Sequence, residues 1–206
     1  MDIKENKDLN SNPSQQEMSN LERLANSYNF NDLEKKTNQL IEKYPQNNNL
    51  QNILGYALKG QWKFTEALKI FEQIIENNPN FYFAYNNAGN ILKELCRLDE
   101  AKDLYEKSIK INPQFIDSYI NLGQIFLDLN QLSEASAVFN EGLKLAPKQT
   151  ILHRYLSQVT KYNEKNLHLK HMEKIILDEN LTNDQQMHLY FALGKAYEDI
   201  KYYPKA

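Results

Sequence analysis

NILGYALKGQWKFTEALKIFEQIIENNP, residues 52–79, is the stretch that decides the fold, because its pattern recurs twice more at one fixed interval. The recurring residues are a glycine (Gly55, Gly89, Gly123), an alanine (Ala67, Ala101, Ala135), an aromatic (Phe71, Tyr105, Phe139) and a proline (Pro79, Pro113, Pro147). A period of 34 with this pattern predicts a repeat protein with two antiparallel helices per unit.

Each recurring residue type has a physical role. Gly55 and its equivalents fall inside the first helix, where glycine costs about 1 kcal/mol relative to alanine, so a close helix contact must compensate. The alanines are expected to serve the same contact from the second helix, while the aromatic side chains fill the wider gap one turn on. The prolines are expected to end the second helix.

The motifs NILGYAL, NNAGNIL and NLGQIFL, at residues 52–58, 86–92 and 121–127, resemble the tetratricopeptide repeat family. The resemblance implies an all-α fold, a right-handed superhelical solenoid of antiparallel helix pairs. It also implies a concave groove, lined by the first helices, that binds peptides or partner proteins.

The same register divides the chain. Residues 48–150 hold the three regular repeats, preceded by a divergent first repeat or cap at 21–47 and by a mostly disordered segment at 1–20. Residues 151–186 form a divergent helical repeat with an insertion, because Gly194 follows Gly123 by two periods plus three further positions. We expect helices at 153–162 and 167–177 there, and a capping box of Thr182 with Gln185 before the next helix. Residues 187–206 then read as the truncated start of a further repeat, so we expect a fragment of a longer protein.

Composition limits the function classes. A net charge of -3 and a pI near 5.9 provide no basic field, so no nucleic-acid partner is expected. No apolar run is long enough for a membrane span or a signal peptide. The single cysteine, Cys96, fits a reducing compartment, and we expect it to be a small buried hydrophobe. These features favour a cytoplasmic protein, and the abundance of Asn, Lys and Ile favours a bacterial source.

Side chains of the first helices that are free from packing are the candidate peptide-binding residues. They are Asn52, Tyr56, Asn86, Asn87, Asn90, Asn121 and Gln124. An amide both donates and accepts, so a row of amides can pair with an extended peptide backbone. The row resembles the asparagine ladder of O-GlcNAc transferase repeats, with Asn87 and Asn121 in matching positions and Ile53 departing from it. The alternative is that these are solvated amides of an asparagine-rich chain.

Other site types find little support in the sequence. A clamp for a C-terminal carboxylate needs Lys or Arg where Asn52, Asn86 and Ile120 stand. His168 and His171 lie three residues apart but lack a partner at metal-binding spacing, while His153 and His188 are isolated. We find no catalytic motif and expect no metal or cofactor, so the expected partner is a protein or peptide.

A narrower resemblance covers residues 152–206. This part, and FALGKAYED at 191–199 above all, is similar to the segment that joins the repeats to the catalytic domain in bacterial tetratricopeptide-repeat sulfotransferases. The resemblance implies a separate catalytic domain that transfers a sulfuryl group from phosphoadenosine phosphosulfate. The six glycines here offer no phosphate loop, so in this alternative the chain is the non-catalytic arm of a sulfotransferase.

Overall fold

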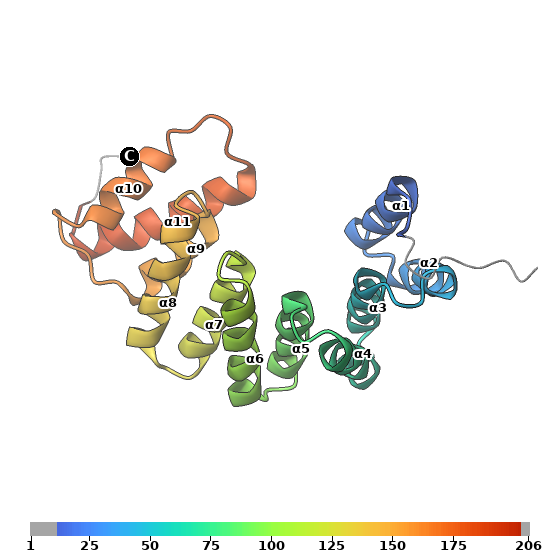
Figure 1. Cartoon of the computed structure of the whole chain (residues 1–206). Helices are drawn as coiled ribbons and strands as arrows, with labels where there is room; N and C mark the ends of the chain where they lie inside the picture. The colour runs from blue at the N-terminus through green and yellow to red at the C-terminus, as the bar shows by residue number, and fades with distance from the viewer. Residues whose placement is uncertain (1–11, 203–206) are drawn as a thin grey trace, which may run out of the picture. The chain divides into compact units, whose positions relative to one another are not determined.

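The computed structural model describes residues 12–202, which form eleven α-helices and no strand, as the repeat pattern predicts (Figure 1). The helices are α1 (Gln15–Asn26), α2 (Phe30–Lys43), α3 (Asn48–Gly60), α4 (Phe64–Asn77), α5 (Tyr82–Glu94), α6 (Leu98–Ile111), α7 (Ile116–Asp128), α8 (Leu132–Leu145), α9 (Thr150–Val159), α10 (Leu167–Ile175) and α11 (Asn183–Asp199). They form two compact units, and the division falls inside α6, between Lys107 and Ser108.

Capping boxes mark the starts of α1 and α11. Ser14 forms a capping box with Glu17, in which Glu17 N donates to Ser14 Oγ at 3.2 Å. Helix α1 therefore begins at Gln15, inside the segment 1–20 for which the sequence predicts disorder, while residues 1–11 lie outside the described residues. The predicted capping box of Thr182 and Gln185 is confirmed at the start of α11.

The recurring glycines mark close contacts between paired helices, as predicted. A Cβ at Gly55 would lie 2.5 Å from Cζ of Phe71, and one at Gly89 would lie 2.8 Å from Cε1 of Tyr105. Gly123 meets Phe139 in the same way. The aromatic ring therefore packs on the glycine itself and does not fill a separate gap one turn on.

A second recurring contact joins the first helix of a repeat to the proline before it. The donors are Gln51, Tyr85, Tyr119 and His153, which stand at the same position of successive repeats. Each bonds the carbonyl oxygen of the proline six positions earlier, at a distance between 2.8 and 3.1 Å. The common requirement at this position is an N–H or O–H group that reaches the turn.

The turn after the first helix also recurs, and it has positive φ angles at residues that are not glycine. These residues are Tyr28, Trp62, Cys96, Asn130 and Lys201. After α3, Trp62 N donates to Lys59 O at 2.9 Å and Lys63 N donates to Leu58 O at 3.0 Å, which is the Schellman pattern. None of the six glycines has a positive φ, so they act through their size.

The first repeat exchanges the large and small residues of the regular repeats. Leu21 stands in the glycine position and Thr37 in the aromatic position, each one period before its regular equivalent. Both side chains are buried, at 1% and 0% exposure. The hydroxyl of Thr37 has no hydrogen-bond partner among the described residues.

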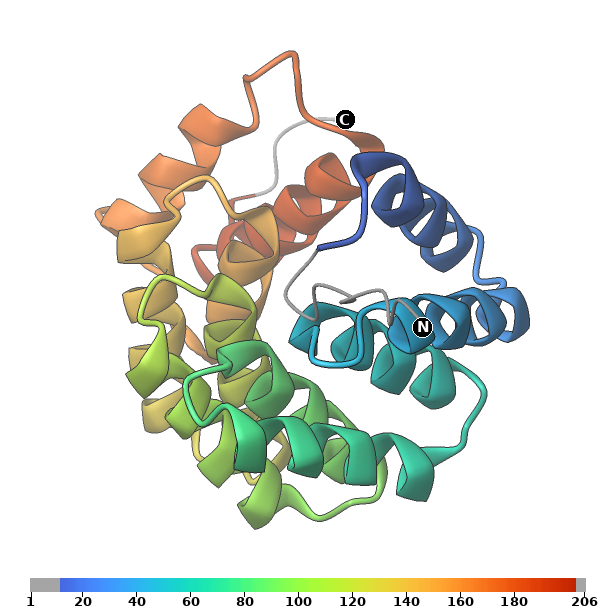
Figure 2. The same cartoon turned by 45° about the vertical axis from the view of Figure 1, so that its right-hand side comes forward.

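The last three helices of the unit from residue 108 onward, α9 to α11, depart from the pattern of the regular repeats. The predicted helices at 153–162 and 167–177 are found as α9 at Thr150–Val159 and α10 at Leu167–Ile175. Helix α11 packs along α9 and also contacts α10 (Figures 1 and 2). The core between α10 and α11 includes Met172, Leu189 and Ala192, all fully buried. No helix within residues 12–202 has the length and apolar character needed to cross a membrane.

Candidate binding surfaces

The predicted amide row is partly joined by hydrogen bonds between repeats. Asn87 on α5 donates through Nδ2 to Oδ1 of Asn52 on the neighbouring helix α3, at 2.8 Å. Both side chains are half-buried. Within the described part of the chain, Nδ2 of Asn52 and Oδ1 of Asn87 make no further hydrogen bond, so this pair retains a donor and an acceptor for a ligand.

Two other predicted asparagines are engaged in the fold. Asn86 is only 5% exposed. Asn90 accepts a hydrogen bond from the Tyr105 hydroxyl at 2.8 Å, and burial raises the pKa of that phenol. Replacement of Asn90 would therefore leave a buried hydroxyl without its acceptor, so neither residue is suitable for a clean test of binding.

Tyr56 lies beside the Asn52–Asn87 pair in the sequence register of α3 and is 38% exposed. Its ring meets Phe30 edge to face, with centroids 5.7 Å apart, and Phe30 meets Tyr28 in the same way at 6.1 Å. Tyr56 thus presents an aromatic surface that the neighbouring ring holds in place. We define Asn52, Tyr56 and Asn87 as the first-helix face.

Asn121 and Gln124 lie on α7, in the unit from residue 108 onward. Gln124 donates through Nε2 to the hydroxyl of Tyr155 on α9. The Tyr155 ring in turn stacks on Phe139, with centroids 5.5 Å apart. Asn121 is half-buried. The amide of Gln124 therefore links neighbouring repeats here, as Asn87 does in the first unit.

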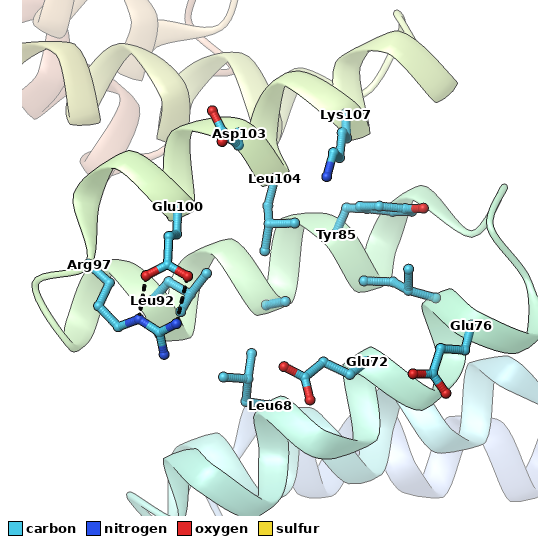
Figure 3. Close-up of a pocket in the computed structure, with 12 residues that line it drawn as sticks. Leu68, Glu72, Glu76, Tyr85, Leu92, Arg97, Glu100, Asp103, Leu104 and Lys107 are labelled. Carbon is cyan, nitrogen blue, oxygen red and sulfur yellow. Dashed lines mark hydrogen bonds and ion pairs between the residues drawn. The ribbon is translucent and has the colours of Figure 1, made fainter.

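A groove lies between the second helices α4 and α6, with α5 as its floor, and has a volume of about 460 Å³ (Figure 3). Leu68, Leu92 and Leu104 give it an apolar lining. Glu72 and Glu76 project from α4, and Lys107 projects from α6 (Figure 3). No sequence pattern points to this groove, because its lining combines residues of three different helices and of the turn before α6.

One ion pair lies in the wall of this α4–α6 groove. Arg97 binds Glu100 through two hydrogen bonds of 2.7 and 2.6 Å, and these bonds hold the pKa of Glu100 below its ordinary value. Both partners are exposed to solvent, so the pair contributes little to stability.

A chain of hydrogen bonds connects His153 with two residues that follow α9. The carbonyl oxygen of Pro147 can only accept, so Nε2 of His153 carries the hydrogen and donates to it at 2.8 Å. Nδ1 of His153 then accepts from Nε2 of His168 at 2.8 Å, and Nδ1 of His168 accepts from the Tyr162 hydroxyl at 2.7 Å. His153 is therefore not isolated, contrary to the sequence prediction.

His153 and His168 are both neutral near pH 7. Burial lowers the pKa of His153 to about 4 and that of His168 to about 3, where the neighbouring His153 adds to the effect. His171 lies on the same side and reaches the Pro147 carbonyl oxygen at 3.1 Å. Among the residues that the structure describes, no group of three or more His, Cys, Asp or Glu side chains could hold a metal ion.

Cys96 is exposed, so the prediction that it is a small buried hydrophobe is wrong. Its place in the turn after α5 explains this, because the residue with positive φ after each first helix points away from the helix pair. His188, also predicted to be isolated, lies 3.3 Å from the hydroxyl of Thr150 through Nδ1.

Comparison with family models finds a tetratricopeptide repeat match over residues 96–159. Among curated proteins, none matches this sequence significantly. The match includes the third regular repeat and continues through α9. It supports the family resemblance that the repeat period indicates.

Solved structures give the same fold. A thermophilic TPR protein of Thermus thermophilus is 14% identical with a TM-score of 0.69, over 87% of this chain and 98% of that one. PilF of Pseudomonas aeruginosa is 16% identical with a TM-score of 0.68, over 89% and 84%. MamA of Desulfovibrio magneticus, from residue 41 to its end, is 14% identical with a TM-score of 0.59, over 90% and 93%.

These likenesses concern the fold, because the identities are low. The fold is an all-helical solenoid of repeats, as in these tetratricopeptide repeat structures, and the family model itself matches residues 96–159. A shared fold does not assign a function, so a function for this chain has to be argued from its own side chains.

Proposed function

We propose that this chain is a scaffold that binds an extended peptide, or an extended segment of a partner protein, along its first helices. The concave groove that the repeat resemblance implies is the surface in question. Within the first unit, the first-helix face of Asn52, Tyr56 and Asn87 is the part of it that we propose to contact the ligand. Asn121 and Gln124 are proposed to play the same role on α7, within the second unit.

The pairing of Asn52 with Asn87 at 2.8 Å is the observation that carries the proposal. A hydrogen bond between two amides leaves the NH2 group of Asn52 and the carbonyl oxygen of Asn87 available, and these match the C=O and N–H groups of an extended peptide backbone. Tyr56 adds an exposed ring of the kind enriched in binding sites. Recognition of this type depends on the peptide backbone and therefore tolerates many sequences.

The experiment is a selection of peptides from a random displayed library against the full chain, followed by measurement of their affinity by fluorescence anisotropy. We expect Asn52→Ala combined with Asn87→Ala to weaken binding about tenfold or more, since two hydrogen bonds worth about 1 kcal/mol each are removed. Thermal melts of the variant separate lost contacts from lost structure.

Asn38 provides a matched control, because it is an exposed asparagine of the second helix α2 in the same unit. Asn38→Ala should leave the affinity unchanged. If Asn52→Ala with Asn87→Ala also leaves it unchanged, the amides are solvated surface groups and the first-helix face is not the binding surface. Asn86 and Asn90 are left intact for the reasons given above.

The alternative of a sulfotransferase arm stays a prediction, since no observation on residues 12–202 favours it over the binding role. The cytoplasmic location and the bacterial source remain predictions as well. Any activity of a sulfotransferase parent would reside outside the repeats described here.

A further inference from the structure

Two sequence positions independently identify α11 as the first helix of a repeat. Gly194 follows Gly123 at the same distance in sequence as Lys201 follows Asn130, so both fall in one shifted register. Lys201 has a φ of 57°, and Tyr202 N donates to Tyr197 O at 2.9 Å. The turn after α11 therefore has the Schellman geometry that follows the other first helices.

One face of α11 is apolar and open. Met187, Tyr190 and Phe191 are 43%, 62% and 59% exposed, and with Gly194 they follow the spacing of a single helix face. They line a shallow hollow of about 540 Å³. We call this set the α11 outer face.

Gly194 differs from the recurring glycines in its contacts with other helices. Gly55, Gly89 and Gly123 each lie under an aromatic ring of the following helix. At Gly194, a Cβ would meet no atom within 4 Å among the described residues. The α11 outer face is therefore equivalent to the face that the first helix of each regular repeat buries under its second helix. Among the described residues, no second helix covers it at α11.

We propose that the α11 outer face binds an amphipathic helix that places an aromatic ring on Gly194. The chemistry of the occupant follows from the regular repeats. A small residue four positions before the ring, as Ala67 stands before Phe71, lets the two helices approach each other. This inference is independent of the proposed role of the first-helix face.

The charges next to the face have both signs, and the one that lies on the Phe191 ring, Arg154, favours a carboxylate on the bound helix. The Arg154 guanidinium lies 4.9 Å from the Phe191 ring centroid, and it forms no ion pair within residues 12–202. Lys195 lines the hollow, although it also pairs with Asp199 at 2.5 Å. Helix α4 carries three glutamates and one lysine over 64–77, so its sequence matches both the ring position and the charge.

The test is the binding of a fluorescein-labelled peptide with the sequence of residues 64–77 to the full chain, measured by fluorescence anisotropy. We expect saturable binding that weakens about tenfold or more when the peptide carries Phe71→Ala. Gly194→Ala in the protein should weaken it to a similar extent, because the added methyl group takes the place of the ring.

Gly194→Ala also separates loss of the peptide contact from loss of the fold. Alanine is the better helix former and has open space at this position, so the variant should melt at a higher temperature than the wild type while it binds less peptide. No peptide binding, or binding that neither substitution weakens, would overturn the proposal. Sedimentation velocity decides the remaining case, because a dimer that Gly194→Ala dissociates would assign the face to a second copy and overturn it too.

Discussion

The ring of Phe71 packs directly on the backbone of Gly55, so that a Cβ at position 55 would lie 2.5 Å from Cζ of the ring. Phe71 is fully buried, and its neighbours Ala67 and Ile74 are buried with it, so the ring has no free space to enter. A contact this close makes the glycine a requirement of packing, because its φ is not positive.

Gly55→Ala should destabilise the chain by up to about 2 kcal/mol. Alanine gains about 1 kcal/mol in helix propensity, but overpacking of a buried ring costs about 1–3 kcal/mol, and the second effect prevails. Urea denaturation followed by circular dichroism measures the difference. Gly194→Ala is the matched control and should stabilise the chain by up to about 1 kcal/mol. Equal effects at the two sites would contradict the role assigned to Phe71.

The sequence predicts the helix pairs and their contacts because the glycine, alanine, aromatic and proline positions each require one residue type. It does not predict the turn after each first helix, where Tyr28, Trp62, Cys96 and Asn130 have nothing in common. Backbone hydrogen bonds impose the positive φ there, so the side chain gives no signal. Only their regular spacing, which equals the repeat period, could have connected these positions.

The candidate binding residues show a similar limit. The helical spacing places Asn52, Asn87 and Asn90 on first helices, which the structure confirms. It cannot show that Asn90 accepts the hydrogen bond of Tyr105, because that contact joins two separate helices. The α4–α6 groove and the histidine chain were missed for the same reason, since each combines residues of separate elements.

Thr37→Val should stabilise the first repeat. The hydroxyl of Thr37 is buried and has no partner in the described residues, and a buried unsatisfied polar group costs about 1–3 kcal/mol. Valine has nearly the same shape, so the packing against α1 is kept. We expect a gain of about 1 kcal/mol or more in the free energy of unfolding, measured in urea. A loss of stability would mean that the hydroxyl finds a partner in solution.

Cys96→Gly should also stabilise the chain, by up to about 0.5 kcal/mol. Cys96 has a φ of 58°, a conformation that costs a residue with a Cβ about 1 kcal/mol and costs glycine nothing. The gain is reduced by the greater freedom of glycine in the unfolded chain. Asn130→Gly provides the comparison, because asparagine tolerates this conformation and should gain less. A larger gain at Asn130 than at Cys96 would contradict this explanation of the turn.

Acid should destabilise the unit that contains His153 and His168. Their pKa values, about 4 and about 3, lie below the ordinary value of 6.5, so the unfolded chain binds protons more readily than the folded one. The stability from these groups is therefore complete above pH 6.5 and is lost as the pH falls from 6.5 toward those lower values. Each histidine contributes a slope of up to about 1.4 kcal/mol per pH unit over this range.

Urea denaturation at several pH values between 7.5 and 5 would measure that slope, in a range above the ordinary pKa of carboxylates (about 4). The titratable groups that face the histidines from the packed elements are His171 on α10, Lys161 and Asp199. His153→Gln keeps a donor for the Pro147 carbonyl oxygen and removes one titrating group. It should therefore lower the slope by up to about 1.4 kcal/mol per pH unit, the contribution of one proton. His188→Gln, at a less buried histidine, should change the slope less. An unchanged slope in His153→Gln would show that the neutral state of His153 does not contribute to stability.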